Sequence, residues 1–126
     1  MQWEAILVFK KPGSMPKMDR EGQAYMKNYQ TNVWEVTQVV NQKDKIGHPA
    51  VCPIEIPYRS LQAYSRKGQT ILEPFGGSGT TLLAAEKAGR KACLMEQHPA
   101  YCDVIIRRWE EMTGEKAEIT ERSVAS

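Results

Sequence analysis

The feature that most constrains this chain is the segment Glu-Pro-Phe-Gly-Gly-Ser-Gly at residues 73–79. It follows a short run of β-forming residues at 70–73 and precedes strong helix formers at 80–88, which Gly89 closes. Its small residues let the backbone approach a ligand without interference from Cβ atoms. The free amides and positive dipole end of the following helix would point at the same place. We therefore expect residues 73–79 to form a strand-to-helix loop that holds a cofactor.

A second strand and helix follow this loop. Residues 92–95 are apolar and predict a strand that ends at Glu96, and a long amphipathic helix opens at His98 and Pro99 and ends at Gly114. Strand, helix, strand and helix in this order predict a βαβ unit with a parallel sheet. Ligands bind beyond the carboxyl ends of such strands, and an acidic residue about 20 positions after the loop can accept hydrogen bonds from ribose hydroxyls. The arrangement predicts a nucleoside-type cofactor.

Other loops of similar composition fit less well. A P-loop needs a lysine before its Ser or Thr, whereas Gly79 is followed directly by Thr80 and Thr81. A dinucleotide-binding fingerprint needs a third glycine, and Leu82 stands at that position. A tight turn that binds nothing would not need three glycines.

Bulk properties narrow the class of protein. The 126 residues suit one domain but would be cramped for a full open sheet with helices on both faces. The net charge of +2 permits a nucleic-acid partner without arguing for one, because nucleic-acid modules usually carry a denser basic stripe. The odd set Cys52, Cys93 and Cys102 contains no CxxC pair and favours a reduced, cytoplasmic protein. No apolar run approaches the roughly 20 residues that span a bilayer, so no membrane partner is expected.

The residues before the loop predict further elements. The apolar run at 5–9 predicts a strand buried on both faces. Residues 13–30 are polar and predict an exposed loop, and residues 32–36 predict a short strand or an extended anchor. After the proline-bracketed segment 48–53, residues 54–65 have the apolar spacing of a helix.

These segments resemble a known family, the DNA amino-methyltransferases. Phe-Gly-Gly-Ser-Gly at 75–79, extended to Glu-Pro-Phe-Gly-Gly-Ser-Gly-Thr-Thr, resembles motif I of these enzymes. His-Pro-Ala-Val-Cys-Pro at 48–53 resembles motif X, and residues 94–114 resemble motif II and its closing helix. Motif X directly before motif I is similar to the permuted group called β. Residues 6–13 and 32–36 resemble the region before motif X, so the resemblance covers nearly the whole chain.

The resemblance implies a fold, a cofactor and a reaction. The fold is α/β, a Rossmann-like methyltransferase fold that is partial here and contains the C-terminal half of the parallel sheet. The cofactor is S-adenosyl-L-methionine (AdoMet), and its methyl group goes to the exocyclic amino group of adenine, or of cytosine, in DNA. The single partial domain 1–126 then comprises a strand plus exposed loop at 1–47, the motif X helix and AdoMet-binding βαβ unit at 48–114, and a tail at 115–126.

The resemblance also implies which residues bind the cofactor. Phe75, Gly77 and Gly79 would shape the pocket, with Ser78 and Thr80 near the methionine carboxylate. The acidic residue after the second strand would bind the ribose, and motif X would close over the methionine end. The full set is His48, Pro49, Ala50, Glu73, Phe75, Gly76, Gly77, Ser78, Gly79, Thr80 and Glu96.

This sequence departs from the family pattern at two positions. The family usually has Asp where Glu73 stands, and the extra methylene is expected to shift a hydrogen bond without removing it. It commonly has an aromatic residue or lysine where Cys52 stands, for which we expect a small buried apolar side chain without a reactive role. The basic pairs at 66–67 and 107–108 are expected to be solvated surface more often than phosphate contacts.

The motif that such enzymes need for catalysis, Asp/Asn/Ser-Pro-Pro-Tyr/Phe/Trp, does not occur in this sequence. Its polar groups orient the target amino group and its aromatic ring stacks on the flipped base. The nearest string, Ile56-Pro57-Tyr58, lacks the polar residue. In the permuted order the motif belongs before residues 5–9. We therefore expect no catalytic residue here and, besides DNA, a partner: an N-terminal methyltransferase half or a second chain that carries the motif.

Other functions stay open at this point. A non-catalytic AdoMet-binding remnant or interaction module, of the kind a decayed prophage gene leaves, fits the same motifs. An unrelated nucleotide-binding oxidoreductase is disfavoured by the missing third glycine. No metal site is expected, because His98 and Cys102 lie one helical turn apart but no second pair completes four ligands. The edge and apolar surface of a half-sheet favour a homo-oligomer.

Overall fold

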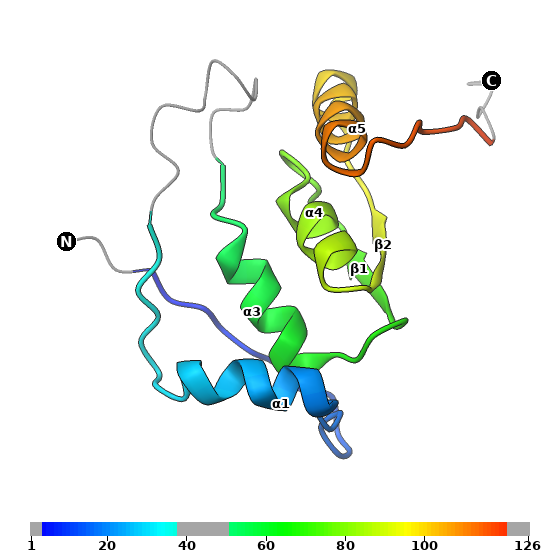
Figure 1. Cartoon of the computed structure of the whole chain (residues 1–126). Helices are drawn as coiled ribbons and strands as arrows, with labels where there is room; N and C mark the ends of the chain where they lie inside the picture. Colours follow the sequence, from blue (N-terminus) through cyan, green and yellow to red (C-terminus); the bar gives the residue numbers. More distant parts are fainter. Residues whose placement is uncertain (1–3, 38–50, 121–126) are drawn as a thin grey trace.

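The computed structural model describes residues 4–37 and 51–120. Helix α4 lies between α3 and a two-stranded sheet (Figure 1). Helix α1 crosses one end of α3, and α5 packs against α4 on the opposite side of the molecule from α1. The elements in chain order are α1 (Arg20–Met26), the 3-10 helix η1 (Lys27–Tyr29), α3 (Glu55–Tyr64), β1 (Thr70–Glu73), α4 (Thr80–Lys87), β2 (Lys91–Leu94) and α5 (Pro99–Thr113).

The C-terminal half is the βαβ unit that the sequence predicts. Strands β1 and β2 pair in parallel, with Thr70 opposite Lys91 and Glu73 opposite Leu94, and α4 makes the crossover. The element bounds lie within one residue of the predicted ones for α4 and β2. Pro99 sits in the first turn of α5, and Gly114 ends that helix with a φ of 76°. The predicted α/β class and parallel sheet are therefore confirmed.

The core forms where α3, α4 and the inner face of the sheet meet. Leu61 of α3 packs with Ala84 and Ala85 of α4, and both alanines are 0% exposed. Ile71 and Ala92, the inward residues of the two strands, close this cluster from the other side. Small side chains on α4 let its neighbours approach from both sides, so α4 is the central element of the unit.

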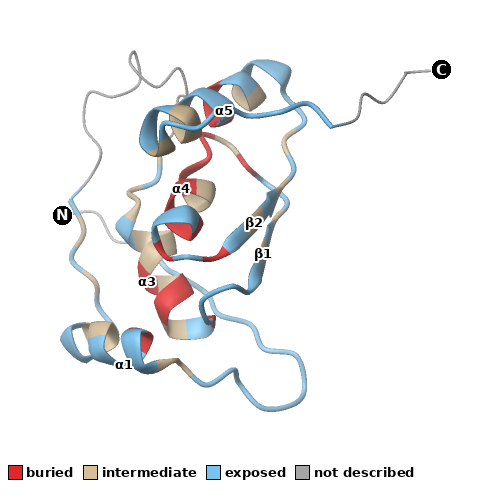
Figure 2. Cartoon of the chain, turned by 45° about the vertical axis from the view of Figure 1, so that its right-hand side comes forward, coloured by how far each residue is buried: buried red, intermediate tan, exposed pale blue. Residues whose placement is uncertain are grey.

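The other face of the sheet is exposed. Burial alternates along both strands, and the outward residues include Leu72 and Cys93, which are opposite one another in the register. Leu72 is 71% exposed. Figure 2 shows the contrast between α3 and α4, which carry buried segments, and the largely exposed strands. Parallel sheets are normally covered on both faces, whereas the described residues cover only one face of this sheet.

Arg90 joins the C-terminal ends of α3 and α4. It is 4% exposed and lies just before β2. Its guanidinium donates to the carbonyls of Ser65 at 3.0 Å and Leu61 at 3.3 Å, to the Ser65 hydroxyl at 3.1 Å, and to the carbonyl of Ala88. A cation at two helix C-termini interacts favourably with the carbonyls and the negative dipole ends that meet there.

The predicted strand at 5–9 is wrong. This segment is extended but belongs to neither strand of the sheet, and its side chains are exposed, with Leu7 at 73% and Phe9 at 88%. An apolar run becomes a buried strand only where a neighbouring strand supplies its hydrogen bonds, and neither β1 nor β2 pairs with this segment.

The predicted exposed loop at 13–30 is also wrong, because α1 and η1 occupy much of it. Asp19 caps α1, accepting a hydrogen bond from the Gly22 amide at 2.8 Å. Gly22 is buried against α3: a Cβ at this position would lie 2.6 Å from the backbone oxygen of Gln62. Tyr25 also meets Tyr58 of α3 edge-on, at 5.2 Å between ring centroids. Packing on α3 thus adds to a helix whose residues are mostly good helix formers, with Gly22 as the unfavourable exception.

Residues 32–36 form no strand, and the extended-anchor alternative describes them better. Trp34 is partly buried, and the guanidinium carbon of Arg59 lies 5.7 Å from its ring centroid and 4.0 Å from that of Tyr29. In the two described stretches, the helices are all too short or too polar to cross a bilayer.

Candidate functional site

The predicted loop and Glu96 lie together at the carboxyl ends of β1 and β2. The amide of Gly76 donates to the carbonyl of Met95 at 2.8 Å, and the amide of Met95 donates to the carbonyl of Glu73 at 2.9 Å. These bonds continue the parallel ladder one step beyond the sheet. The loop therefore runs directly over the end of β2, which is where a ligand binds in open α/β sheets.

Two of the loop glycines pack closely against Ile105 of α5. A Cβ on Gly79 would lie 3.0 Å from Cγ1 and 3.1 Å from Cγ2 of Ile105, and a Cβ on Gly76 would lie 3.1 Å from Cδ1 of the same side chain. Gly79 also has a φ of 80° and Gly77 a φ of 56°, both in the left-handed region. The expected reason for these glycines was the approach of a ligand. At Gly76 and Gly79 the structure gives another reason, which is the close packing of α5 beneath the loop.

Glu73 holds the base of the loop. One carboxylate oxygen accepts from the Phe75 amide at 2.9 Å, and the other accepts from the Thr81 hydroxyl at 3.0 Å. The side chain thus bridges the end of β1 and the first turn of α4. This explains how glutamate serves at this position: its extra methylene lets the carboxylate reach across the loop.

Glu96 holds the middle of the loop. Its Oε1 accepts from the His98 amide and its Oε2 accepts from the Gly77 amide, both at 2.8 Å. These two backbone hydrogen bonds, that of His98 foremost, lower the pKa of the carboxyl. Each carboxylate oxygen has a second lone pair, so Glu96 can still accept hydrogen bonds from ligand hydroxyls.

The hydroxyls of Ser78 and Thr80 point into the protein. Each residue is 5% exposed, and their hydroxyl oxygens lie 3.2 Å apart. Arg108 of α5 meets them: its Nη1 donates to the Ser78 carbonyl at 2.5 Å and to the Thr80 hydroxyl at 3.3 Å. Burial lowers the pKa of Arg108. The expectation that the basic pair at 107–108 is solvated surface is therefore wrong for Arg108, which lies partly buried under the loop.

Backbone amides remain available at the start of α4. Within the described stretches, the amides of Ser78, Thr80 and Thr81 make no hydrogen bond to the protein. They lie where the dipole of α4 is positive, and such amides bind carboxylates and phosphates. The donor set of the loop thus fits an anionic group, supplied by the main chain and not by the two buried hydroxyls.

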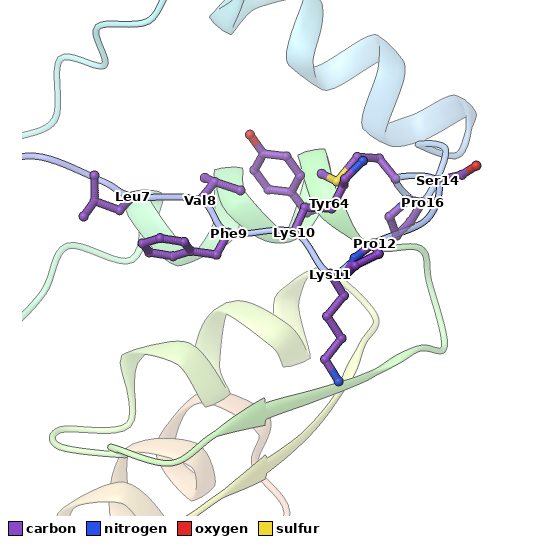
Figure 3. A pocket seen from close by; sticks show the side chains of 10 residues that line it. Leu7, Val8, Phe9, Lys10, Lys11, Pro12, Ser14, Pro16 and Tyr64 are labelled. Atoms are coloured by element: carbon purple, nitrogen blue, oxygen red, sulfur yellow. The ribbon is translucent and has the colours of Figure 1, made fainter.

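Phe75 of the loop and Met95, which follows β2, are both exposed. A hollow of about 500 Å³ lies elsewhere, between residues 7–16 and Tyr64 of α3 (Figure 3). None of the predicted cofactor residues in the described stretches lines it. The hollow is therefore separate from the loop site.

The motif X residues His48, Pro49 and Ala50 lie outside the described residues. Cys52, which follows them, is exposed in the coil before α3. The expectation of a buried Cys52 is wrong, because none of the described helices or strands packs over this stretch closely enough to cover its side chain.

Comparison with known proteins decides the family. Residues 1–107 match the family model for DNA methylases of the N6/N4 type. The chain belongs to this DNA methylase family. The match includes the exposed run at 5–9 and continues through most of α5, so the resemblance found in the motifs is confirmed.

Two proteins with curated descriptions are similar to this chain over most of its length. Type II methyltransferase M.MthZI of Methanothermobacter thermautotrophicus is 32% identical in an alignment 135 residues long, which covers 96% of this chain and 38% of that protein. DNA adenine methyltransferase YhdJ of Escherichia coli is 33% identical over 111 residues, covering 83% and 38%. The chain thus spans about two fifths of the length of these curated relatives.

A solved structure shares the fold. A putative DNA modification methylase from Thermus thermophilus, complexed with S-adenosyl-L-methionine, aligns with a TM-score of 0.60 and 25% identity, covering 86% of this chain and 47% of that one. Its uncomplexed form aligns with a TM-score of 0.62. The partial Rossmann-like methyltransferase fold predicted for the chain is confirmed.

Proposed function

We propose that this chain is the cofactor-binding part of an AdoMet-dependent DNA methyltransferase that acts on the exocyclic amino group of adenine, or of cytosine. One observation carries the proposal: the loop at 74–79 lies over the end of β2 with its middle amide on Glu96 and with the first amides of α4 unoccupied. The family membership and the AdoMet bound to a structural neighbour agree with it.

Different residues bind different parts of the cofactor. The free amides of Ser78 and Thr80 bind the methionine carboxylate, because they lie at the positive end of α4. The remaining lone pairs of Glu96 accept the ribose hydroxyls. Phe75 borders the adenosine, and the motif X residues His48, Pro49 and Ala50 close over the methionine end. The bound cofactor supplies an electrophilic methyl group, and this chain orients it.

Groups that orient the target base belong to another polypeptide segment. The sequence has no Asp-Pro-Pro-Tyr-type motif, and the relatives are more than twice as long as the matched region. The outward sheet face, with Leu72, Cys93 and the neighbouring Met95, is an apolar surface on which such a segment or a second copy of the chain packs. DNA is then the substrate of the assembled enzyme.

Isothermal titration calorimetry tests the cofactor proposal. We expect the purified chain to bind AdoMet and S-adenosylhomocysteine and not NAD. Gly77→Val should abolish binding, because a β-branched residue at a φ of 56° costs about 1–3 kcal/mol and moves the amide that meets Glu96. Cys52→Ala, at an exposed position before α3, is the matched control and should bind normally.

The outcomes separate the alternatives. Binding of NAD in place of AdoMet would indicate an oxidoreductase. Methylation of DNA by the purified chain alone would contradict the division between cofactor binding and catalysis. AdoMet binding without methylation after addition of a motif-bearing partner would favour the non-catalytic remnant.

A further inference from the structure

Arg108 contacts the cofactor loop from below, 30 residues away in the sequence. Its Nη1 reaches the Ser78 carbonyl at 2.5 Å and the Thr80 hydroxyl at 3.3 Å. Ile105, one turn earlier on the same face of α5, touches the loop at Gly79. One apolar and one charged side chain of α5 therefore support the loop together.

These contacts fix the peptide plane between Ser78 and Gly79 from both sides. The Ser78 carbonyl accepts from Arg108, while the Gly79 amide donates to the Gly76 carbonyl at 2.8 Å. Because a peptide unit is planar, holding its oxygen and its N–H sets its orientation. The amides of Ser78 and Thr80 flank this plane, so their directions depend on it.

The positive charge of Arg108 also affects this end of α4. The described residues give this guanidinium no salt bridge, and Glu111, on the next turn of α5, is the only acidic group that acts on it through space. The other groups it meets, the Ser78 carbonyl and the Thr80 hydroxyl, are neutral. A partly buried cation beside the positive end of α4 adds to the preference of that helix end for an anion.

We infer that Arg108 is a positioning residue of the loop, which orients the Ser78 and Thr80 amides and makes the site selective for ligands that carry a carboxylate. This inference rests on the proposed AdoMet site and deepens it. Arg108 acts through the loop and through its field, without touching the cofactor itself.

The test compares two ligands that differ only in the carboxylate. S-adenosylhomocysteine carries the full amino-acid group, whereas its decarboxylated analogue keeps the amine, the neutral sulfur and the nucleoside. Their dissociation constants are measured by calorimetry for the unmodified chain, Arg108→Met, Arg108→Lys and the control Arg20→Met. Arg20 lies in the exposed first turn of α1, so the control removes one positive charge far from the loop.

We expect Arg108→Met to weaken the binding of S-adenosylhomocysteine about tenfold or more, because a hydrogen bond from a charged donor is lost. The dissociation constant of the decarboxylated analogue should change by less than about twofold from its value for the unmodified chain. Arg108→Lys should recover part of the preference, because it keeps the charge but not the guanidinium fork. Arg20→Met should change neither ligand.

Equal weakening of the binding of both ligands would overturn the inference, since Arg108 would then stabilise the pocket for any ligand. So would unchanged affinity for both. If Arg108→Met does not unfold cooperatively on heating, Arg108→Gln takes its place, because the amide keeps a donor without the charge; it must lower the same preference. Failure of the unmodified chain to bind either ligand would instead refute the proposed cofactor site.

Discussion

Gly79→Ala should destabilise this protein through two separable effects. The first is conformational: at a φ of 80° an alanine costs about 1–2 kcal/mol. The second is steric, because the new Cβ would lie 3.0 Å from Cγ1, 3.1 Å from Cγ2 and 3.3 Å from Cα of Ile105. Contacts of this kind in a packed interface cost about 1–3 kcal/mol more. We expect a total loss of about 2–5 kcal/mol in the free energy of unfolding, from the same two sources.

Gly114→Ala is a matched control for the conformational effect alone. Gly114 has a φ of 76°, and a Cβ there would meet no atom within 4 Å. Urea denaturation followed by circular dichroism gives both free energies of unfolding. Their difference isolates the contact between the loop and Ile105. If Gly79→Ala is no more destabilising than Gly114→Ala, α5 does not constrain the loop as described.

Three further predictions test other contacts. The stability that the Glu96 carboxylate provides should be present at neutral pH and should be lost as the pH falls below about 4.5 and through its lowered pKa. The free energies of unfolding of the unmodified chain and of Glu96→Gln should therefore converge in acid. A difference between them that does not change with pH would contradict this. Gly22→Ala should destabilise α1 by about 1–3 kcal/mol, because its Cβ would lie 2.6 Å from a backbone oxygen of α3, and amide hydrogen exchange in α1 should rise selectively. Arg90→Met should lower stability by about 3 kcal/mol in urea, because three helix-end carbonyls lose a charged donor; a loss under about 1 kcal/mol would show that water replaces it.

The side chains that hold the loop in place limit what substitutions in it can show about ligand binding. Glu73 and Glu96 each bond a loop amide through one carboxylate oxygen and an adjoining segment through the other, and Arg108 supports the loop from α5. A substitution at any of these positions will disturb the loop as well as a bound ligand. Ligand pairs that differ in one group are therefore better probes of this site than single substitutions measured with one ligand.

Local patterns predicted the C-terminal half closely. The glycines that end α4 and α5, the proline that opens α5 and the apolar runs of β1 and β2 act over a few residues, so the sequence was sufficient to locate these elements. The same patterns failed before α3. The run at 5–9 has the composition of a buried strand, but a strand needs a partner, and none of the described strands pairs with it. Helix α1 depends on a buried glycine against α3, and composition alone does not show such a contact.

The sequence by itself determined the family, the βαβ unit and the loop that holds the proposed cofactor, because each is written in a short continuous motif. Only the tertiary structure decided how that loop is held. Ile105 and Arg108 lie far along the chain, and they come beneath Gly79 and Ser78 because α5 packs back against α4. The glycines at 76 and 79 therefore pack against α5, and the side chains of Ser78 and Thr80 are buried on the protein side of the loop. Contacts between distant segments depend on packing geometry, which no local pattern specifies.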